Sequence, residues 1–551
     1  MTKIIIIGGV SGGMSAAARL RRLMEEAQII VFDKGPYVSF ANCGLPFHVS
    51  GEIAERSDLL VQTPETLNKR FALDIRTETE VLAIDPSKKE VTAVNQGKIY
   101  KESYDKLILS PGAKPFIPKI PGLAEAENVF TLRSIPDLDR IMEKLQHTAG
   151  GKAAVVGAGF IGLEMAENLT KKGMDVTLIE KANHILPPFD EEMAALAEEE
   201  LHRQGITVYT NQAVQLFKDK GKTLILEDGR QLKSDLTILA VGVQPESELA
   251  QAAGLQLGER SGIIVNENYQ TSNPDIYAVG DAILVKQELT KKDSLISLAG
   301  PANRQGRQVA DIIAGLPRKN KGSLGTAIVR IFDKTATSTG LNEGLARRYF
   351  PHTAVLHIAG KDHAGYYPDA ADLNLKLIFD SRTGAIYGAQ AVGEKGVDKR
   401  IDVLATAIKA KLTVFDLPEL EFSYAPPFGS AKDPVHIAGY AASNIIEGQS
   451  TPIQWYDLDK ALAGGEILLD VRTKEEFKQG HITGSCNLPL NDLRSQMASL
   501  DKSKDYIVSC HSGQRSYIAE RILKQNGFRV HNLDGAYSLY RRVKPEKIST
   551  H

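Results

Sequence analysis

The sequence predicts an α/β fold made of several domains, and three observations predict it. First, the chain has 551 residues, of which 42% are hydrophobic and 24% charged, an ordinary globular composition that suits about three to four domains. Second, two segments far apart in the chain both read as strand, glycine turn, helix and strand. Third, strand-like and helical runs alternate again toward the C-terminus.

The first of these segments begins with the strand Ile4 to Ile7. A glycine-rich turn, Gly8-Gly9-Val10-Ser11-Gly12-Gly13, leads into a helix from Met14 to Met24, and the strand Ile29 to Phe32 then ends on Asp33. In such a unit the glycines allow a tight turn and close packing of helix on strand, and the helix N-terminus holds a phosphate. Val10 stands where a middle glycine is usual. The segment predicts a dinucleotide site.

The second segment has the complete glycine pattern. Gly157-Ala158-Gly159-Phe160-Ile161-Gly162 follows the strand Ala153 to Val156, a helix runs to Lys172, and the strand Val176 to Ile179 ends on Glu180. From the last turn glycine to the strand-end acid there are 20 residues in the first copy and 18 in the second. A carboxylate here suits a free ribose 2′-hydroxyl. Glu180 therefore favours NADH, while the adjacent Lys181 leaves NADPH open.

The rest of the chain reads as further strands and helices around one joint. We expect a polar joint at residues 441 to 452 and a last domain from about Ile453. The expected strands are Thr237 to Val243, Ala327 to Phe332, Leu373 to Phe379, Ile467 to Val471, Asn487 to Leu490 and Tyr506 to Ser509, and the expected helices are Lys399 to Ala410 and Ser516 to Gln525. The run from Asn273 to Asp281 reads as a turn, a strand and a terminal acid.

Charge and cysteine content exclude several classes of protein. The net charge is −2, which gives no field for nucleic acid or an anionic membrane. The chain has three cysteines, Cys43, Cys486 and Cys510, too few for a disulfide framework or a four-cysteine metal site. We expect no metal, no nucleic-acid partner and no membrane span, and we place the chain in the cytoplasm.

Several motifs together resemble the pyridine-nucleotide disulfide oxidoreductases. The motifs are Ser39-Phe40-Ala41-Asn42-Cys43-Gly44-Leu45-Pro46, Ser110-Pro111-Gly112-Ala113, Gly242-Val243-Gln244-Pro245, Val279-Gly280-Asp281 and Tyr424-Ala425-Pro426-Pro427. The first is similar to the single-cysteine branch, which holds coenzyme A disulfide reductases, persulfide reductases, and NADH oxidases and peroxidases. The resemblance implies an FAD domain (1–115 and 250–322), an NAD(P) domain (116–249) and a dimerisation domain (323–445) that makes a homodimer.

The same resemblance implies which residues bind the cofactors. The residues expected to bind FAD are Gly8, Gly13, Asp33, Lys34, Ser110, Gly112 and Asp281, and those expected to bind the nicotinamide cofactor are Gly157, Gly159, Gly162, Glu180 and Gly242.

Cys43 is the expected redox thiol of this branch. No second cysteine lies within 400 residues of it, so it must work alone, by accepting a thiol or sulfane sulfur from a substrate. The alternative is a sulfenic acid formed with peroxide or oxygen. Peroxidases of the branch carry a histidine just after the first turn, where this chain has Ser11, and that favours the sulfur substrate.

Basic and polar residues near the first turn suggest a coenzyme A site. Arg19 and Arg22 share one helix face, which by spacing alone could equally be a solvated basic face. By resemblance to the coenzyme A branch, the expected contacts are Arg19, Arg22, Ser39, Asn42, Asn303 and Lys432. Guanidinium groups suit phosphates. A lysine contact of some relatives is replaced here by Phe71.

Two tyrosines, Tyr366 and Tyr424, match positions that reach the partner subunit's thiol in relatives. We expect them to orient substrate or to protonate a leaving thiolate. The alternative interpretation is that both are buried core aromatics.

The last domain (446–551) carries the loop Cys510-His511-Ser512-Gly513-Gln514-Arg515 between a strand and a helix. Loop N–H groups and the helix N-terminus stabilise a thiolate at such a place, and Arg515 adds a cation. With Asp470-Val471-Arg472, Glu475-Glu476-Phe477 and Gly480-His481-Ile482, the domain resembles the rhodanese family, which implies a Cys510 persulfide. The alternative is an inert docking domain. We expect Cys486 to be a buried structural thiol rather than a second sulfur acceptor.

The leading hypothesis is an FAD-dependent NAD(P)H reductase of coenzyme A persulfide, polysulfide or disulfide, in which Cys510 relays sulfane sulfur and sulfide is released. The alternatives are an NADH oxidase or peroxidase using a Cys43 sulfenic acid, and a redox-sensing or sulfur-carrier protein with slow turnover.

Overall fold

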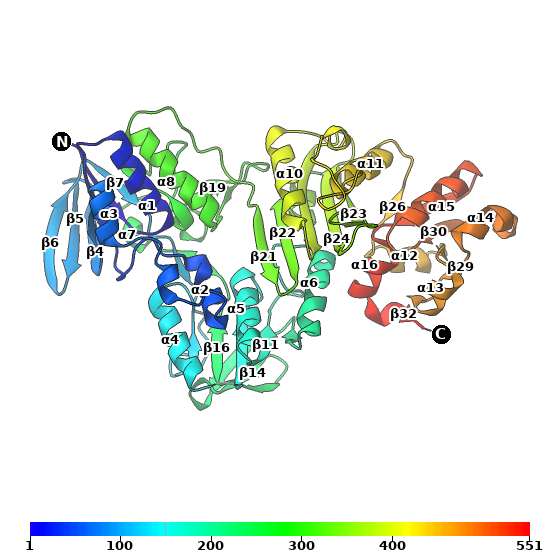
Figure 1. The fold of residues 1–551 in the computed structure, drawn as a ribbon, viewed down its shortest axis with the longest axis horizontal. Coiled ribbons are helices and arrows are strands. Elements are labelled where there is room, and N and C mark those ends of the chain that lie inside the picture. The colour runs from blue at the N-terminus through cyan, green and yellow to red at the C-terminus, as the bar shows by residue number, and fades with distance from the viewer. Residues whose placement is uncertain (149, 551) are drawn as a thin grey trace. The chain divides into compact units, whose positions relative to one another are not determined.

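The structure is a computed structural model that describes residues 1–148 and 150–550. The chain forms two compact units. The first comprises Met1–Ala182 and Ile206–Gly325, and the second comprises Asn183–Gly205 and the chain from Thr326 onward. Figure 1 labels the elements of both.

The first unit contains a parallel sheet built around the N-terminal strand. Its strands, in spatial order, are β18 (Ile276–Ala278), β7 (Lys106–Leu109), β1 (Lys3–Ile7), β2 (Gln28–Phe32) and β3 (Asp74–Arg76). Ile4, Ile5 and Ile6 are 0% exposed, as expected for a central parallel strand covered on both faces. Helices α1 (Ser11–Leu23) and α8 (Ala299–Ile313) pack against each other, blue and green in Figure 1.

A second parallel sheet in the same unit repeats this design. Its strands, in order, are β12 (Thr207–Tyr209), β11 (Asp175–Ile179), β10 (Lys152–Val156), β16 (Leu236–Leu239) and β9 (Val129–Phe130). Helix α5 (Phe160–Lys171) packs on β10, β11 and β16 and also contacts α2 (Leu45–Ser50). The remaining helices of the unit are α3 (Pro64–Phe71), α4 (Ile135–Gln146) and α7 (Glu248–Ala252).

Antiparallel strands accompany both sheets. They are β4 (Thr79–Asp85), β5 (Glu90–Asn95) and β6 (Lys98–Ser103); β13 (Val214–Lys218), β14 (Thr223–Leu226) and β15 (Gln231–Lys233); β8 (Ala113–Pro115) with β17 (Val243–Pro245); and β19 (Val285–Lys286) with β20 (Asp293–Ser294). The β8–β17 pair joins the segments that leave the two parallel sheets.

The second unit contains an antiparallel sheet. Its strands, in order, are β21 (Ala327–Ile331), β22 (Lys334–Gly340), β25 (Ile386–Gly393), β24 (Asp372–Asp380) and β23 (Thr353–Lys361). The helices of this part are α6 (Glu191–Arg203), α9 (Glu343–Tyr349), α10 (Val397–Ala410) and α11 (Pro434–Ile446). Helix α6 comes from the segment between the two halves of the first unit, yet it packs on β22 and β25.

The C-terminal part of the second unit has its own parallel sheet. Its strands, in order, are β26 (Pro452–Ile453), β31 (Arg529–Leu533), β30 (Asp505–Ser509), β27 (Ile467–Asp470) and β29 (Cys486–Asn487), with a separate pair β28 (His481–Ile482) and β32 (Ile548–Ser549). Its helices are α12 (Leu458–Ala463), α13 (Lys474–Lys478), α14 (Leu490–Gln496), α15 (Gln514–Gln525) and α16 (Ala536–Val543). Helix α16 packs on α6, where Arg542 Nε donates to Glu199 at 3.0 Å.

Three local predictions are wrong. The first half of the expected joint at 441–452 is helical. Helix α11 begins after its N-cap Asp433, and its apolar sequence continues to Ile446. At the other end of the expected joint, Pro452 already pairs with β31. The expected strand at 237–243 breaks before Gly242, whose φ is +108°. The expected strand at 487–490 ends at Asn487, and Leu490 starts α14.

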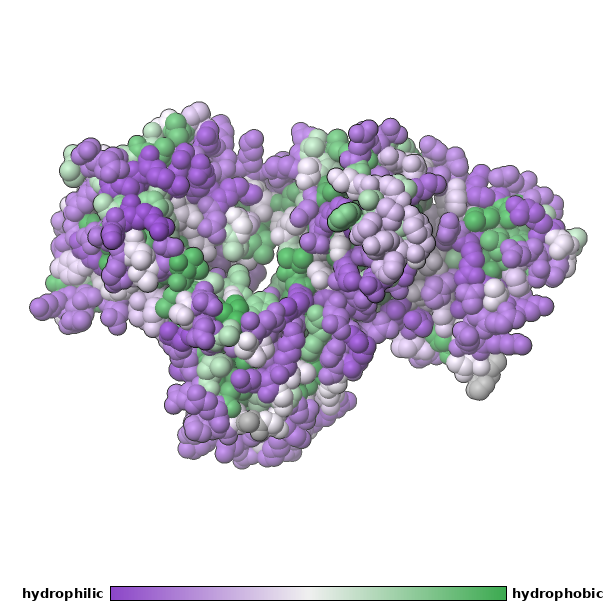
Figure 2. Space-filling view, in the orientation of Figure 1, coloured by the Kyte–Doolittle hydropathy of each residue, from purple (hydrophilic) through white to green (hydrophobic). Residues whose placement is uncertain are grey.

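The exposed face in Figure 2 is covered mainly by hydrophilic side chains. Among the described residues, every helix is too short or too polar to cross a lipid bilayer.

Candidate active site

The first glycine turn is held by contacts that leave no room for side chains. A Cβ on Gly8, whose φ is +104°, would lie 2.0 Å from the Ser110 carbonyl oxygen, and a Cβ on Gly13 would lie 1.8 Å from the Gly8 oxygen. Both contacts are with backbone, so only glycine fits. Asp33 fastens the turn, since its Oδ2 accepts from the Gly9 N–H at 2.7 Å. Burial raises the pKa of Asp33 despite this bond.

The second turn repeats this geometry with one difference. A Cβ on Gly157 would lie 2.4 Å from the Ala240 oxygen, and one on Gly162 would lie 1.9 Å from the Gly157 oxygen. Buried Glu180 accepts from the Ala158 N–H at 2.7 Å, as Asp33 does in the first turn. A Cβ on Gly159 would meet no atom within 4 Å. This open place at the start of α5 fits a pyrophosphate, which approaches the backbone at the middle glycine.

The other residues predicted to bind cofactors lie in the first unit around these turns. The Ser110 Oγ lies 2.9 Å from where a Gly12 Cβ would be, beside the first turn. Gly112 and Gly242 have positive φ values of 76° and 108°. Lys34 is mostly exposed and its ammonium pairs with Glu246.

Asp281 lies at the N-terminal side of α8. Its neighbour Gly280 donates its N–H to Gln305 Oε1 at 2.7 Å, which ties the Asp281 turn to that helix. Burial raises the pKa of Asp281, and Arg133 opposes that effect. Gln305 and Arg133 were not predicted, because neither stands in a recognisable motif.

Cys43 lies in a short 3-10 turn just before α2. Its backbone N–H donates to the Asn42 Oδ1 at 3.1 Å, and its Sγ lies 3.7 Å from the same oxygen. The side chain is accessible to solvent, which agrees with a reactive rather than a core thiol. Burial by surrounding protein, Glu164 of α5 and Asp281 all raise the pKa of Cys43. Glu164 was not predicted to face the thiol.

Of the basic residues of α1, Arg19 contacts α8. Arg19 Nε donates to Asp311 Oδ1 at 2.7 Å, and Arg318 binds the other oxygen of the same buried carboxylate at 3.2 Å. Arg22 is exposed and donates only its Nε, to the Ala18 oxygen. Within the described residues, the Nη atoms of Arg19 and Arg22 have no hydrogen-bond partner, so both are available to an anion.

The other predicted coenzyme A contacts are divided between the units. Asn303 of α8 accepts from the Ser15 Oγ of α1 at 2.6 Å. Ser39 has a positive φ of 49° and donates its N–H to the Gly9 oxygen at 2.8 Å, which sets the Cys43 segment beside the first turn. Lys432 belongs to the second unit and is exposed there.

The two predicted tyrosines form a pair on the second unit. Tyr366 is 77% exposed and Tyr424 50% exposed, and their hydroxyl oxygens lie 3.3 Å apart. They are therefore surface residues and not core aromatics. The hydrogen bond between the two hydroxyls raises the pKa of Tyr366, so Tyr366 keeps its proton at neutral pH.

Cys510 lies at the bottom of its loop and its residue is 1% exposed. Its Sγ accepts from the Gly513 N–H at 3.1 Å and lies 3.4 Å from the Ser516 Oγ, at the start of α15. These donors suit a thiolate. Arg515 donates from both Nη atoms to Glu476 at 2.7 Å each. Glu476 stands in one of the motifs that resemble the rhodanese family, but its pairing with Arg515 was not predicted.

The prediction for Cys486 is wrong, because this thiol is exposed. It lies on β29, a two-residue strand at the edge of the C-terminal sheet. An edge strand this short is not covered by a neighbour on its outer side.

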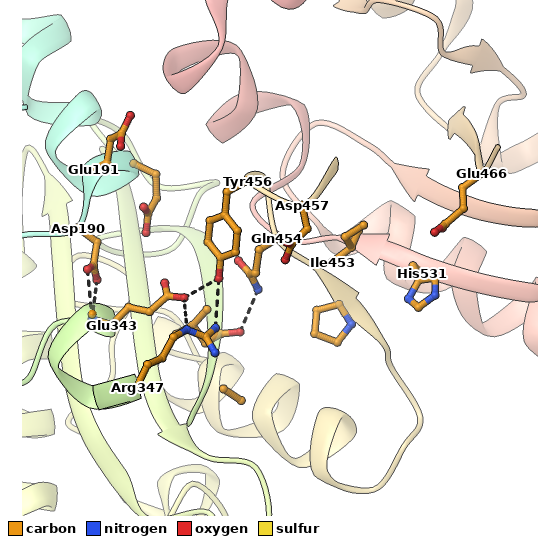
Figure 3. Close-up of a pocket in the computed structure, with 15 residues that line it drawn as sticks. Asp190, Glu191, Glu343, Arg347, Ile453, Gln454, Tyr456, Asp457, Glu466 and His531 are labelled. Carbon is orange, nitrogen blue, oxygen red and sulfur yellow. Dashed lines mark hydrogen bonds and ion pairs between the residues drawn. The ribbon is translucent and has the colours of Figure 1, made fainter. Parts of the chain in front are cut away.

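A separate cavity of about 670 Å³ lies in the second unit, and six of its fifteen lining residues are aspartate or glutamate (Figure 3). Asp190, Glu192 and Glu343 converge there as metal ligands would. The Lys376 ammonium already sits among them, at 3.0, 2.5 and 2.7 Å. This lysine, together with Arg347 on Glu343 and His357 on Glu192, compensates their charge, and the cluster joins α6, α9 and β24.

Two glycine turns that suit dinucleotides, with one exposed thiol in the same unit, define an oxidoreductase with two nucleotide sites. A family model for the pyridine nucleotide-disulphide oxidoreductases matches residues 2–306. The model of that family's dimerisation domain matches residues 326–433, and a rhodanese-like domain matches residues 455–542. The chain therefore belongs to the pyridine nucleotide-disulphide oxidoreductases and carries a rhodanese-like domain, which confirms the predicted fold class.

Curated relatives and solved structures agree with this assignment. A coenzyme A disulfide reductase of Staphylococcus haemolyticus is 37% identical over 451 residues, which are 81% of this chain and all of the relative. The crystal structure of reduced Bacillus anthracis CoADR-RHD is 50% identical, with a TM-score of 0.97 over 99% of both chains. An NAD-dependent persulfide reductase from A. fulgidus is 37% identical, with a TM-score of 0.92 over 98% of this chain and all of that one.

Proposed function

We propose that the protein is an FAD-dependent NADH:coenzyme A persulfide and disulfide reductase with Cys43 as its single redox thiol. The observation that carries the proposal is an exposed, unpaired Cys43 in the unit that holds both glycine turns, with no second cysteine in that unit. The names of the similar proteins support the same substrates.

We assign FAD to the first turn and NADH to the second. Residues 1–115 with 250–322 would form the FAD domain and 116–249 the NADH domain. FAD, when bound, supplies the two electrons from NADH that restore the Cys43 thiolate. The chain's part is to hold the two dinucleotides. Gly8 and Gly13 close the first turn, and Asp33 fixes it. Gly159 leaves the second turn open.

Cys43 would perform the sulfur chemistry. Its thiolate attacks one sulfur of the bound substrate, a new S–S bond forms at Sγ, and the other sulfur leaves as a thiolate or as sulfide. Because burial, and then Glu164 and Asp281, raise the pKa of Cys43, the attack requires that the proton be moved away first. In a homodimer, which the matched dimerisation domain (323–445 in our division) supports, Tyr366 and Tyr424 of the partner subunit would protonate the leaving group.

Coenzyme A would lie along α1. The helix rises about 1.5 Å per residue, so Arg22 stands roughly 16 Å beyond Ser11 at its start. That span suits a thiol arm that ends at Cys43 and phosphates that reach Arg19 and Arg22. Ser39, Asn42 and Asn303 would complete the contacts within this unit. Replacing Arg22 by glutamine should raise the KM for coenzyme A disulfide but leave the KM for pantethine, which lacks the phosphates, unchanged.

The C-terminal domain (446–551) would act as a sulfurtransferase. Cys510 would accept sulfane sulfur as a persulfide and pass it to a small thiol such as coenzyme A, which carries it to Cys43. The N–H of Gly513 and the hydroxyl of Ser516 would stabilise the terminal sulfur in the loop.

The test compares the wild type with Cys43→Ser and, as a control, Cys486→Ser. We expect Cys43→Ser to abolish NADH oxidation with coenzyme A disulfide and sulfide release from coenzyme A persulfide, and Cys486→Ser to behave as wild type. Full NADH-dependent sulfide release by Cys43→Ser would refute the mechanism. A water-forming NADH oxidase from Lactobacillus brevis is 26% identical with a TM-score of 0.78, so rapid oxygen consumption without a sulfur acceptor would instead favour the oxidase hypothesis.

A further inference from the structure

Two guanidinium groups beside the Cys510 loop are already paired with carboxylates of the chain. Arg515 donates a hydrogen bond from each Nη atom to Glu476, at 2.7 Å each. Arg472 donates from its Nε and Nη2 to Asp470, at 2.9 and 2.6 Å. Its Nη2 also donates to the Gly480 oxygen at 2.8 Å. Bidentate pairs of this kind occupy the donor fork of the guanidinium. The charge of each arginine is therefore already compensated by a carboxylate of the chain.

A third arginine near the loop, Arg541, is exposed and has no carboxylate partner among the described residues. Its guanidinium carbon lies 5.9 Å from the centre of the Tyr537 ring. Burial, and then Arg472 and Arg541, lower the pKa of His511, which follows Cys510; Glu476 opposes them, and Arg515 lowers it further. All three arginines therefore act on this loop, but only Arg541 is not neutralised.

The charge left at the loop limits which sulfur donor can react. A Cys510 thiolate has one negative charge, and thiosulfate has two, so their encounter needs uncommitted cations nearby. A thiol persulfide has one negative charge at its reacting sulfur, so its encounter with the thiolate needs fewer cations than that of thiosulfate. The loop donors, Gly513 N–H and Ser516 Oγ, are both directed at the Cys510 sulfur.

We propose that Glu476, by pairing with Arg515, makes the Cys510 loop select a thiol persulfide over a dianionic donor such as thiosulfate. The inference rests on the proposed sulfurtransferase role and names its donor class. The Cys510 thiolate attacks the terminal sulfur of R–S–S⁻ and forms a new S–S bond. The bond between that sulfur and R–S breaks, and R–S⁻ leaves with the electron pair. No oxidant or reductant is needed. With thiosulfate the same displacement would release sulfite.

The position of Glu476 makes a clean variant possible. Glu476 also belongs to the cap of α13, where its Oε2 accepts from the Thr473 N–H at 3.0 Å and its N–H donates to the Thr473 Oγ1 at 3.2 Å. Glutamine keeps both cap bonds but loses the charge that neutralises Arg515. Glu475, next in the chain, is exposed and has no ion pair within the described chain, so Glu475→Gln is the matched control.

The experiment uses the full-length flavoprotein as wild type, Glu476→Gln, Glu476→Asp and Glu475→Gln. Each is reacted once with pantetheine persulfide, whose only charge is at the persulfide, or with thiosulfate. The persulfide on the Cys510 peptide is measured by mass, and released sulfite by assay. We expect wild type, Glu475→Gln and Glu476→Asp to prefer pantetheine persulfide, and the ratio of thiosulfate rate to persulfide rate to rise about tenfold in Glu476→Gln.

Two results would count against the proposal. If the wild type takes sulfur from thiosulfate as fast as from pantetheine persulfide, or if the ratio is unchanged in a folded Glu476→Gln, the role of Glu476 is wrong while sulfur transfer stands. If Cys510 takes sulfur from neither donor, the sulfurtransferase role fails as well. NADH oxidation with coenzyme A disulfide, measured on the same preparations, reports the Cys43 chemistry separately.

Discussion

His357 and Asp534 are joined by two contacts. The backbone N–H of His357 donates to Asp534 Oδ1 at 3.0 Å, and the His357 Nδ1 lies 2.7 Å from Oδ2. His357 is on β23 of the antiparallel sheet, and Asp534 follows β31 of the C-terminal sheet. The other ring nitrogen lies 3.1 Å from Glu192 of α6. One buried ring therefore ties the rhodanese-like domain to the rest of its unit, and it is held as a cation between two carboxylates.

This contact should make the second unit less stable as pH rises. Burial lowers the pKa of His357, but Asp534 and Glu192 outweigh it and raise the pKa from 6.5 to about 9. A pKa raised by folding adds stability that is complete below 6.5 and is lost as pH rises to about 9. The shift corresponds to about 3 kcal/mol. Lys376, opposite His357 in the sheet, and the Trp455 N–H also face this group.

The measurement is the fluorescence of Trp455, the only tryptophan of the chain, which lies at this junction. Urea unfolding of the wild type should show the loss between these pH values, and His357→Gln should show a much flatter profile. His202→Gln, on the exposed side of α6, should match the wild type. Parallel profiles for wild type and His357→Gln would contradict the prediction.

Removing the buried lysine should be far more damaging than removing an exposed one. Lys376 is 0% exposed and pairs with three carboxylates. In Lys376→Met the three carboxylates lose the ammonium group that they share, at a cost of about 3–5 kcal/mol. Lys361→Met removes an exposed pair with Asp372 and should cost less than about 1 kcal/mol. Urea unfolding followed by Trp455 compares them, and an equal effect of both variants would disprove the role of burial.

The sequence predicted those parts of the site that backbone geometry fixes locally. Gly8, Gly13, Gly157 and Gly162 could be identified because any Cβ there would strike backbone a few residues or one strand away. The Cys510 loop could be identified because a thiol between a strand and a helix N-terminus is typical of a stabilised, reactive thiolate.

The sequence did not predict the partners that the fold brings from far away. Asp311 meets Arg19 from 292 residues along the chain, and Glu476 meets Arg515 from 39. Lys376 lies in an apolar strand pattern and gives no sign that three acids surround it. These pairs depend on tertiary packing, which no local pattern encodes.

The charge beside Cys43 should control how readily the thiol reacts. Burial, and then Glu164 and Asp281, raise the pKa of Cys43. In Glu164→Gln one negative charge is removed, so the pKa should fall and more thiolate should be present at neutral pH. Alkylation by iodoacetamide, read on the Cys43 peptide across pH, should then be several-fold faster at pH 7. Glu143→Gln, on the exposed side of α4, should leave the profile unchanged. A slower or unaltered reaction in Glu164→Gln would show that Glu164 does not act on the thiol.

The two glycines at the start of α5 should fail in different ways when each is replaced by alanine. A Cβ on Gly162 would lie 1.9 Å from the Gly157 oxygen, so Gly162→Ala must push the helix away from the turn and should lower the melting temperature. A Cβ on Gly159 meets nothing within 4 Å, so Gly159→Ala should fold and melt as wild type. Its methyl group would nevertheless occupy the place proposed for the NADH pyrophosphate, and the KM for NADH should rise about tenfold or more. Gly300→Ala, in α8, also meets nothing within 4 Å and should change neither property. Because the fold tolerates the Gly159 methyl group, an unchanged KM in Gly159→Ala could only mean that the dinucleotide does not approach the chain at this turn.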